Sequence, residues 1–326
     1  MKLRKKFRDR SYFIVLFLLT VLPFNGWTQD FPNRAVKLIV PFPSGGGVDA
    51  VARTVAEKLA LEIKQPVIVE NKGGAGGALG ASWVARSPAD GYTLLFANNG
   101  QAVLPHLQKI DWDPVKDFKP VSNVATYAMV VLVNANSSIK TLPELIRFAK
   151  ANPGHITYGS SGLGGPLHLG MEMLRSAAGI DILHVPYKGN APMTLALLGQ
   201  EIDVSMDTLA VSLPHIKSGK FRALAVTSQR RMTLLPDVPT IREVALPDFD
   251  YEGWQAIFVP LNTPAPLVAR LNAALTKVIA LPGVSQRLIE LGYEPKASSS
   301  QELATLLAKD LLVYRKVVQE ANIKPE

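Results

Sequence analysis

Strand-like and helical segments alternate along this chain, and the alternation restricts it to folds in which helices cover the faces of a sheet. Apolar runs typical of strands span residues 36–42, 67–70, 92–97 and 129–133, and helical patterns follow most of them. The pattern over 49–61 is clear, because Val51, Val55 and Leu59 recur every four residues. The sequence therefore predicts an α/β fold.

Twice, a predicted strand leads through a glycine-rich loop directly into a helix. The loop residues are Ser44, Gly45, Gly46 and Gly47, and, about 115 residues later, Ser160, Ser161, Gly162 and Gly164. We expect the helices to begin at Asp49, whose carboxylate can cap free amides, and at Pro166, which suits a first turn. Free amides and the helix dipole attract anions, and glycine allows close approach. One such loop is more often an ordinary tight turn, but two favour carboxylate binding.

Three polar side chains add candidates for ligand contact. Asn98 follows the strand 92–97, where open α/β sheets place ligand groups, although Asn-Asn-Gly is also a common turn. Asp207 ends the strand 202–206 and can either accept from a ligand or cap a helix. His168 falls in the first turns of the second helix, where it can bind or simply pack.

A dinucleotide-binding enzyme is the main alternative that the residues leave open. The pattern Gly45-x-Gly47-x-x-Ala50 follows a strand, and Glu70 stands at the end of the next strand. Pro41 and Pro43 argue against it, because they stiffen a loop that has to turn tightly. The chain has no cysteine, and its histidines are never three to five residues apart, so we expect neither a metal nor a cofactor.

The first 28 residues have the features of a secretory signal peptide. Six Lys and Arg residues precede an apolar run over 12–24, which is short for a membrane span. These residues carry about +5 of the net charge of +8, so the basic character belongs mainly to the export signal. The remaining Lys and Arg residues are scattered, which argues against nucleic-acid binding. We therefore expect a periplasmic protein.

Eight stretches of this sequence resemble one known family in its order, through nearly the whole chain after residue 28. They are 37–49 (KLIVPFPSGGGVD), 69–77 (VENKGGAGG), 89–94 (ADGYTL), 158–164 (YGSSGLG), 184–189 (HVPYKG), 213–219 (LPHIKSG), 222–228 (RALAVTS) and 235–240 (LPDVPT). The chain is similar to the substrate-binding receptors of tripartite tricarboxylate transporters, also called the Bug family.

This resemblance implies a two-domain periplasmic binding protein of the Venus-flytrap, type II-like fold, with a mixed sheet in each domain, a ligand in the cleft and no catalysis. The expected parts are a signal peptide over 1–28, one domain over 29–130 and 252–326, and another over 131–251. The family's loops fall on Phe42 to Asp49 and on Ser160 to Gly164, with Asn98 and Asp207 facing the cleft.

The implied partners are a small carboxylate ligand and the permease subunits of a tripartite transporter. A monomer is expected, and a receptor that signals to a sensor kinase would share every one of these residues. Val48 departs from the family, which commonly has Thr or Ser there, and this hints at a ligand with fewer polar groups on that side.

Overall fold

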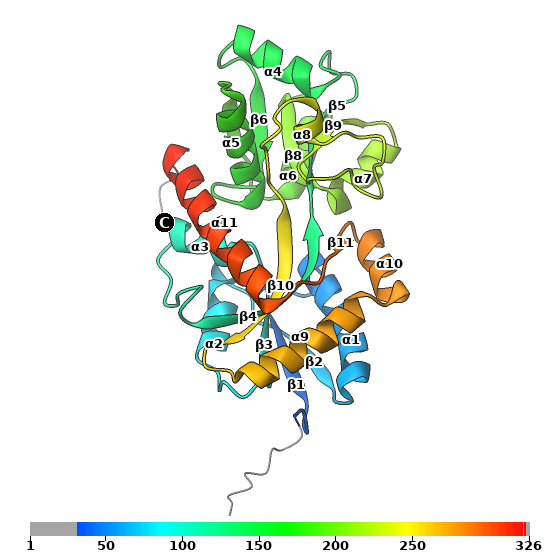
Figure 1. The fold of residues 1–326 in the computed structure, drawn as a ribbon. Helices are drawn as coiled ribbons and strands as arrows, with labels where there is room; N and C mark the ends of the chain where they lie inside the picture. Colours follow the sequence, from blue (N-terminus) through cyan, green and yellow to red (C-terminus); the bar gives the residue numbers. More distant parts are fainter. Residues whose placement is uncertain (1–30, 322, 324–326) are drawn as a thin grey trace, which may run out of the picture.

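The computed structural model describes residues 31–321 and 323, so the predicted signal peptide lies outside the described residues. The described chain forms two stacked lobes, each built around a β-sheet with helices on its faces (Figure 1). Both sheets are mixed, as the family resemblance implies, and the predicted fold class is confirmed.

The first lobe contains a six-stranded sheet in the order β11-β4-β10-β3-β1-β2. Its strands are β1 (Val36–Val40), β2 (Val67–Asn71), β3 (Thr93–Asn98), β4 (Phe118–Tyr127), β10 (Gly253–Pro260) and β11 (Glu294–Pro295). Its helices are α1 (Gly47–Ile63), the 3-10 turn η1 (Ala75–Gly77), α2 (Ala78–Ala85), α3 (Gly100–Leu107), α9 (Ala265–Ile279), α10 (Pro282–Glu290) and α11 (Ser300–Glu320). Strand β1 runs parallel to both β2 and β3, whose carboxyl ends therefore meet at one edge.

The second lobe contains a five-stranded sheet in the order β7-β6-β8-β5-β9. Its strands are β5 (Met129–Asn134), β6 (Thr157–Ser160), β7 (Leu183–Pro186), β8 (Val204–Thr208) and β9 (Phe221–Val226). Its helices are α4 (Leu142–Ala151), α5 (Pro166–Ala178), α6 (Asn190–Leu198), α7 (Leu209–Lys217) and α8 (Ile241–Val244). Strand β6 is parallel to β7 and β8, so these three strands also end at a common edge.

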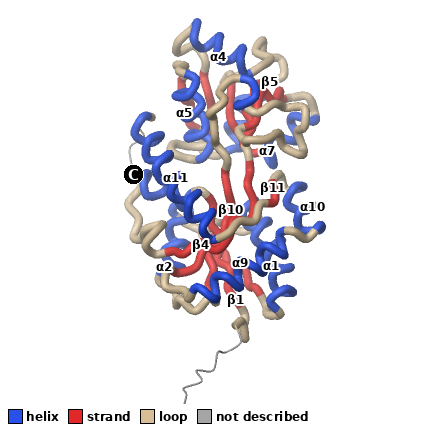
Figure 2. The backbone as a smooth tube through the Cα atoms, viewed as in Figure 1, coloured by secondary structure: helices blue, strands red, loops and turns tan. Residues whose placement is uncertain are grey.

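The chain passes between the lobes in extended backbone and joins them a third time through a helix. It leaves the first sheet at the end of β4, enters the second at β5, and returns at β10 (Figure 2). Helix α11 then packs against α3 and β4 of the first lobe and against α5 of the second. The Tyr251 hydroxyl adds a hydrogen bond of 2.6 Å to the Pro166 carbonyl at the start of α5.

Several elements were not evident from the sequence, for reasons that their residues explain. Strand β4 carries the buried polar residues Ser122 and Asn123, which weaken the apolar alternation of a strand. Ser298 binds both residues, since its carbonyl accepts from Ser122 Oγ at 2.9 Å and its hydroxyl accepts from the Asn123 backbone amide at 2.9 Å. Helices α3 and α7 contain Pro105 and Pro214, which ordinarily interrupt a helical pattern.

Within the described part of the chain, no single helix is long and apolar enough to cross a membrane. Helices α9 and α10 reach that length and hydropathy only as a pair, which is bent by 73°. Helix α9 packs on α1 and β4, with Leu271 and Leu275 buried in the core of the first lobe.

Candidate ligand-binding site

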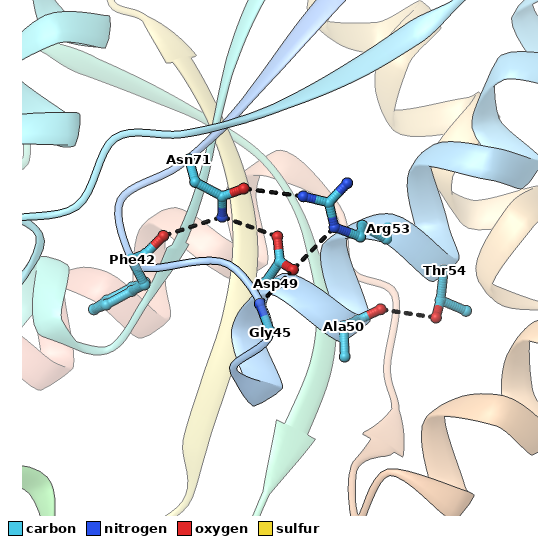
Figure 3. A network of polar contacts seen from close by, with 7 residues as sticks. All are labelled: Phe42, Gly45, Asp49, Ala50, Arg53, Thr54 and Asn71. Atoms are coloured by element: carbon cyan, nitrogen blue, oxygen red, sulfur yellow. Dashed lines mark hydrogen bonds and ion pairs between the residues drawn. The ribbon is translucent and has the colours of Figure 1, made fainter.

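The first glycine loop is held in shape by a network around the Asp49 carboxylate (Figure 3). Three donors reach this carboxylate at 2.9 Å: the Gly45 amide, Arg53 Nε and Asn71 Nδ2. The Asn71 amide also donates to the Phe42 carbonyl at 3.0 Å, and its oxygen accepts from Arg53 at 3.0 Å. The end of β2 and the first turns of α1 thus fix the loop from both sides before any ligand arrives.

Asp49 differs from the expected helix cap in position and partner. Helix α1 begins at Gly47 with Gly46 as its N-cap, so Asp49 is the third helical residue, and its carboxylate binds the amide of Gly45 outside the helix. Burial raises the pKa of this carboxyl, but the hydrogen bonds from Arg53, Gly45 and Asn71 outweigh it, and the pKa is lowered overall. Asp49 is therefore an anion whose described partners all lie within the protein.

The start of α1 faces solvent with its amides uncapped by any side chain. Gly45, Gly46 and Gly47 are all exposed, and Gly45 has φ +84°, a conformation that favours glycine. No side chain makes a capping bond at Gly46, so the free amides and the dipole of a 17-residue helix point outward together. Ser44 is exposed beside them, and Phe42 is partly buried beneath the loop.

In the second loop, as in the first, a side chain from the first turn of the helix accepts a hydrogen bond from a loop amide, but here the side chain is a histidine. Helix α5 begins at Pro166 after the N-cap Gly165, and its third residue, His168, accepts the Gly164 amide on Nδ1 at 2.9 Å. Gly164 has φ +68° and precedes the N-cap, as Gly45 does. In each loop, therefore, the third helical residue binds an amide four positions earlier, and no side chain caps the helix start.

His168 and Ser160 turn toward the interior of the second lobe. His168 stacks on His184 with ring centroids 4.0 Å apart, and the Tyr158 ring stacks against both, at 4.7 Å from His184 and 6.3 Å from His168. Ser160 is fully buried, and its Oγ lies 2.6 Å from His184 Nε2 and 3.0 Å from the Gly162 carbonyl. Burial lowers the pKa of both histidines, that of His184 to about 4. Ser161 and Gly162, in contrast, are partly exposed on the loop surface.

The remaining predicted residues lie at the carboxyl edges of the two sheets. Asn98 ends β3 beside the first loop, and its Oδ1 accepts the Gly100 amide at 2.9 Å. Asp207 lies near the end of β8, which neighbours β6, and its Oδ1 accepts from Asn190 at 2.8 Å and from the Thr208 amide at 2.7 Å. Burial raises the pKa of Asp207 to about 6, against the effect of these hydrogen bonds.

The structure adds residues that the sequence did not indicate. Arg53 and Asn71 build the first loop, and only the position of Asn71 at a strand end hinted at a role. Leu107, at the end of α3, lies across from the second loop, where a Cβ on Gly164 would be 3.0 Å from its side chain. Tyr293, which no local pattern singles out, places its hydroxyl against Gly47.

Three other features of the described residues concern alternative binding sites: a surface cavity, Glu70 and the arrangement of metal-ligating side chains. A surface cavity of about 820 Å³ lies between α5, α11 and residues 242–250, and many of its charged side chains are paired with one another, such as Arg175 with Glu172 and Lys309 with Asp250. Glu70, which a dinucleotide site would need, pairs with Lys37 at 2.8 Å. No group of three or more His, Asp or Glu residues in the described chain is arranged to hold a metal ion.

Comparison with known proteins gives consistent matches over most of the chain. Residues 51–323 match the model of the tripartite tricarboxylate transporter family receptor. A protein encoded in the tcbD-tcbE intergenic region of Pseudomonas sp. strain P51 is 37% identical over 90% of this chain and 88% of its own length. Among solved structures, a periplasmic transporter is 39% identical with a TM-score of 0.75, covering 90% of this chain and 99% of its own. Rpa4515 of R. palustris, solved with adipate, is 33% identical with a TM-score of 0.76, covering 91% and 100%.

Proposed function

Because the chain belongs to the tripartite tricarboxylate transporter receptor family, we propose that it is a periplasmic receptor that captures a small carboxylate between its lobes and delivers it to a membrane permease. The family consists of solute-binding receptors, so the prediction of a non-enzymatic binding protein is confirmed and the dinucleotide-enzyme alternative is set aside. The ligand class, the residues that contact it and the permease are the parts that we propose.

The uncapped start of α1 is the observation that supports carboxylate binding most directly. Three consecutive exposed glycines present backbone to solvent, and the Asp49 network holds them in place. A preformed set of amides loses little conformational entropy on binding, and hydrogen bonds to a charged acceptor are stronger than neutral ones. We therefore assign a ligand carboxylate to the amides around Gly46 and Gly47.

The second lobe provides the other side of the site. Ser161 and Gly162 are accessible on the loop before α5, and Asp207 lies at the carboxyl edge of the sheet in the same lobe. Asn98 lies at the carboxyl edge of the sheet of the first lobe. The side chains of Asp49, Ser160 and His168 make their hydrogen bonds within the protein, so we assign to them the shaping of the site. A relative solved with adipate supports a dicarboxylate that spans both loops.

Ligand capture would involve movement of the lobes about their connections. We propose that residues 29–130 with 252–326 form one domain and residues 131–251 the other, linked where β4 meets β5 and where the chain returns to β10. Closure would bury the ligand and present a joint surface to a permease. Export to the periplasm is supported by the signal-like residues 1–28 and by a periplasmic relative.

Replacement of Gly46 by leucine tests the proposed site. Gly46 has φ −79°, and a Cβ there would approach only the Pro43 carbonyl, at 3.8 Å, so the fold can accept a side chain. That side chain would occupy the space in front of the amides. Binding of adipate, malate, citrate and glutamate is measured by calorimetry on the protein without residues 1–28.

We expect Gly46→Leu to weaken binding of the preferred acid at least tenfold, whereas Gly283→Leu should not change it. Gly283 is a suitable control because it is also exposed, near the start of a helix, with nothing within 4 Å of an added Cβ. Unchanged affinity in Gly46→Leu would exclude the glycine loop as the carboxylate site.

A further inference from the structure

The segment Gly292-Tyr293 touches a helix start in each lobe. An added Cβ on Gly292 would lie 3.2 Å from the Ala210 amide nitrogen, in the first turn of α7. The Tyr293 hydroxyl lies directly against Gly47, the first residue of α1, and would collide with any side chain there. Glycine at position 47 thus leaves room for a phenol over the uncapped start of α1.

The Tyr293 ring packs against strand β4, and its hydroxyl lies at the start of α1. The ring packs edge-on against Tyr127 with centroids 5.6 Å apart. Burial raises the pKa of Tyr293, and the nearby Gln255 side chain opposes this only in part, so the phenol keeps its proton at neutral pH. A phenol donates one proton, and an acceptor at the start of α1 would lie within its reach.

Gln255 shows that the polar arrangement here is incomplete. Its residue is 1% exposed on β10, and its Oε1 has no hydrogen-bond partner in the described structure. A buried carbonyl without a partner is costly, and such groups gather where a ligand or a water completes the set. The neighbouring Tyr127 hydroxyl, in contrast, donates to Asn99 at 2.7 Å.

From this geometry we propose that Tyr293 is a ligand-binding residue that donates its hydroxyl proton to the carboxylate seated at the start of α1. Gly47 provides the space for the phenol, because any side chain there would collide with the Tyr293 hydroxyl. The Tyr293 hydroxyl lies against the first turn of α1, which contains Val48. The side chain of Val48 has no hydrogen-bond donor, so the hydroxyl provides a donor in this turn. This inference rests on the proposed function, because it requires a carboxylate at that loop.

The experiment compares Tyr293→Phe with Tyr127→Phe in the protein without residues 1–28. Both changes remove one hydroxyl and keep the ring, but the Tyr127 hydroxyl is bonded within the protein. Calorimetry measures binding of adipate, malate, citrate and glutamate, and melting of the ligand-free proteins measures folding. We expect Tyr293→Phe to weaken the best of these acids about tenfold or more with a nearly unchanged melting temperature.

Tyr127→Phe should show the opposite pattern, with a lower melting temperature and an affinity within about threefold of the wild type. Equal affinity of Tyr293→Phe and wild type would overturn the role of Tyr293 and leave the receptor function standing. A wild-type protein that binds none of the four acids would count against the proposed carboxylate site, and against the role of Tyr293 with it.

Discussion

His168 accepts the Gly164 amide on Nδ1 at 2.9 Å, so this nitrogen carries no proton in the folded protein. The ring of His184 lies 4.0 Å from that of His168 between centroids. If both rings were protonated, their two positive charges would repel each other at this distance. The shape of the second loop therefore depends on neutral histidines, whereas the first loop depends on the charged Asp49.

The histidine stack predicts a loss of stability in acid. Burial lowers the pKa of both rings, while Glu172 and Arg175 act on His168 in opposite directions. The unfolded chain then binds more protons than the folded one, so stability falls as pH decreases from about 6.5 toward the pKa of about 4 of His184. Urea unfolding between pH 4 and 7 should show this fall, and His168→Asn, which keeps an acceptor for Gly164, should reduce it. An identical pH profile in the variant would contradict the assignment.

For Asp207 we expect the opposite dependence, in which the free energy of unfolding decreases as pH rises. Its pKa is raised by burial from 3.8 to about 6, so the folded protein holds a proton that the unfolded chain releases. Its contribution is present below about pH 4 and is lost as pH rises to about 6, by roughly 2 to 3 kcal/mol. Asp207→Asn should therefore raise the unfolding free energy more at pH 7 than at pH 4. Urea titrations at the two values check this, and a uniform change would count against it.

Asp49→Asn should damage both stability and ligand binding. Donors approach both oxygens of the buried Asp49, and an amide group offers only one acceptor, so at least one donor would face an N–H. We expect a loss of about 1 to 3 kcal/mol in unfolding free energy, together with weaker carboxylate binding. Glu62→Gln is the control, because its bond to Lys277 is exposed and should contribute under about 1 kcal/mol.

Gly80→Ala tests how α2 supports the first loop. A Cβ at Gly80 would lie 2.6 Å from the Lys72 carbonyl and 2.7 Å from Pro41 Cβ, so α2 or the loop has to move. We expect a loss of about 1 to 3 kcal/mol by thermal or urea unfolding. Gly283→Ala, a helical position with open space, should be neutral or stabilising by up to about 1 kcal/mol. Equal stabilities of the two variants would show that the packing around Gly80 yields easily.

The sequence by itself determined the α/β class and both glycine loops. These features depend on neighbouring residues: apolar periodicity selects strand or helix, and consecutive glycines between a strand and a helix leave free amides. Asn98 and Asp207 could be placed at strand ends for the same reason, since parallel strands end at a common edge.

Only the tertiary structure decided what each polar atom of the site does. Asn71 contacts Asp49 because β1 and β2 pair side by side. Tyr293 contacts Gly47 because the chain returns to the first lobe through β10, α9 and α10, and Tyr293 follows α10. Ser160 and His168 turn inward because His184, on a neighbouring strand segment, stacks there. Such contacts join residues far apart in the chain, and they depend on strand pairing and helix packing, which local patterns do not encode.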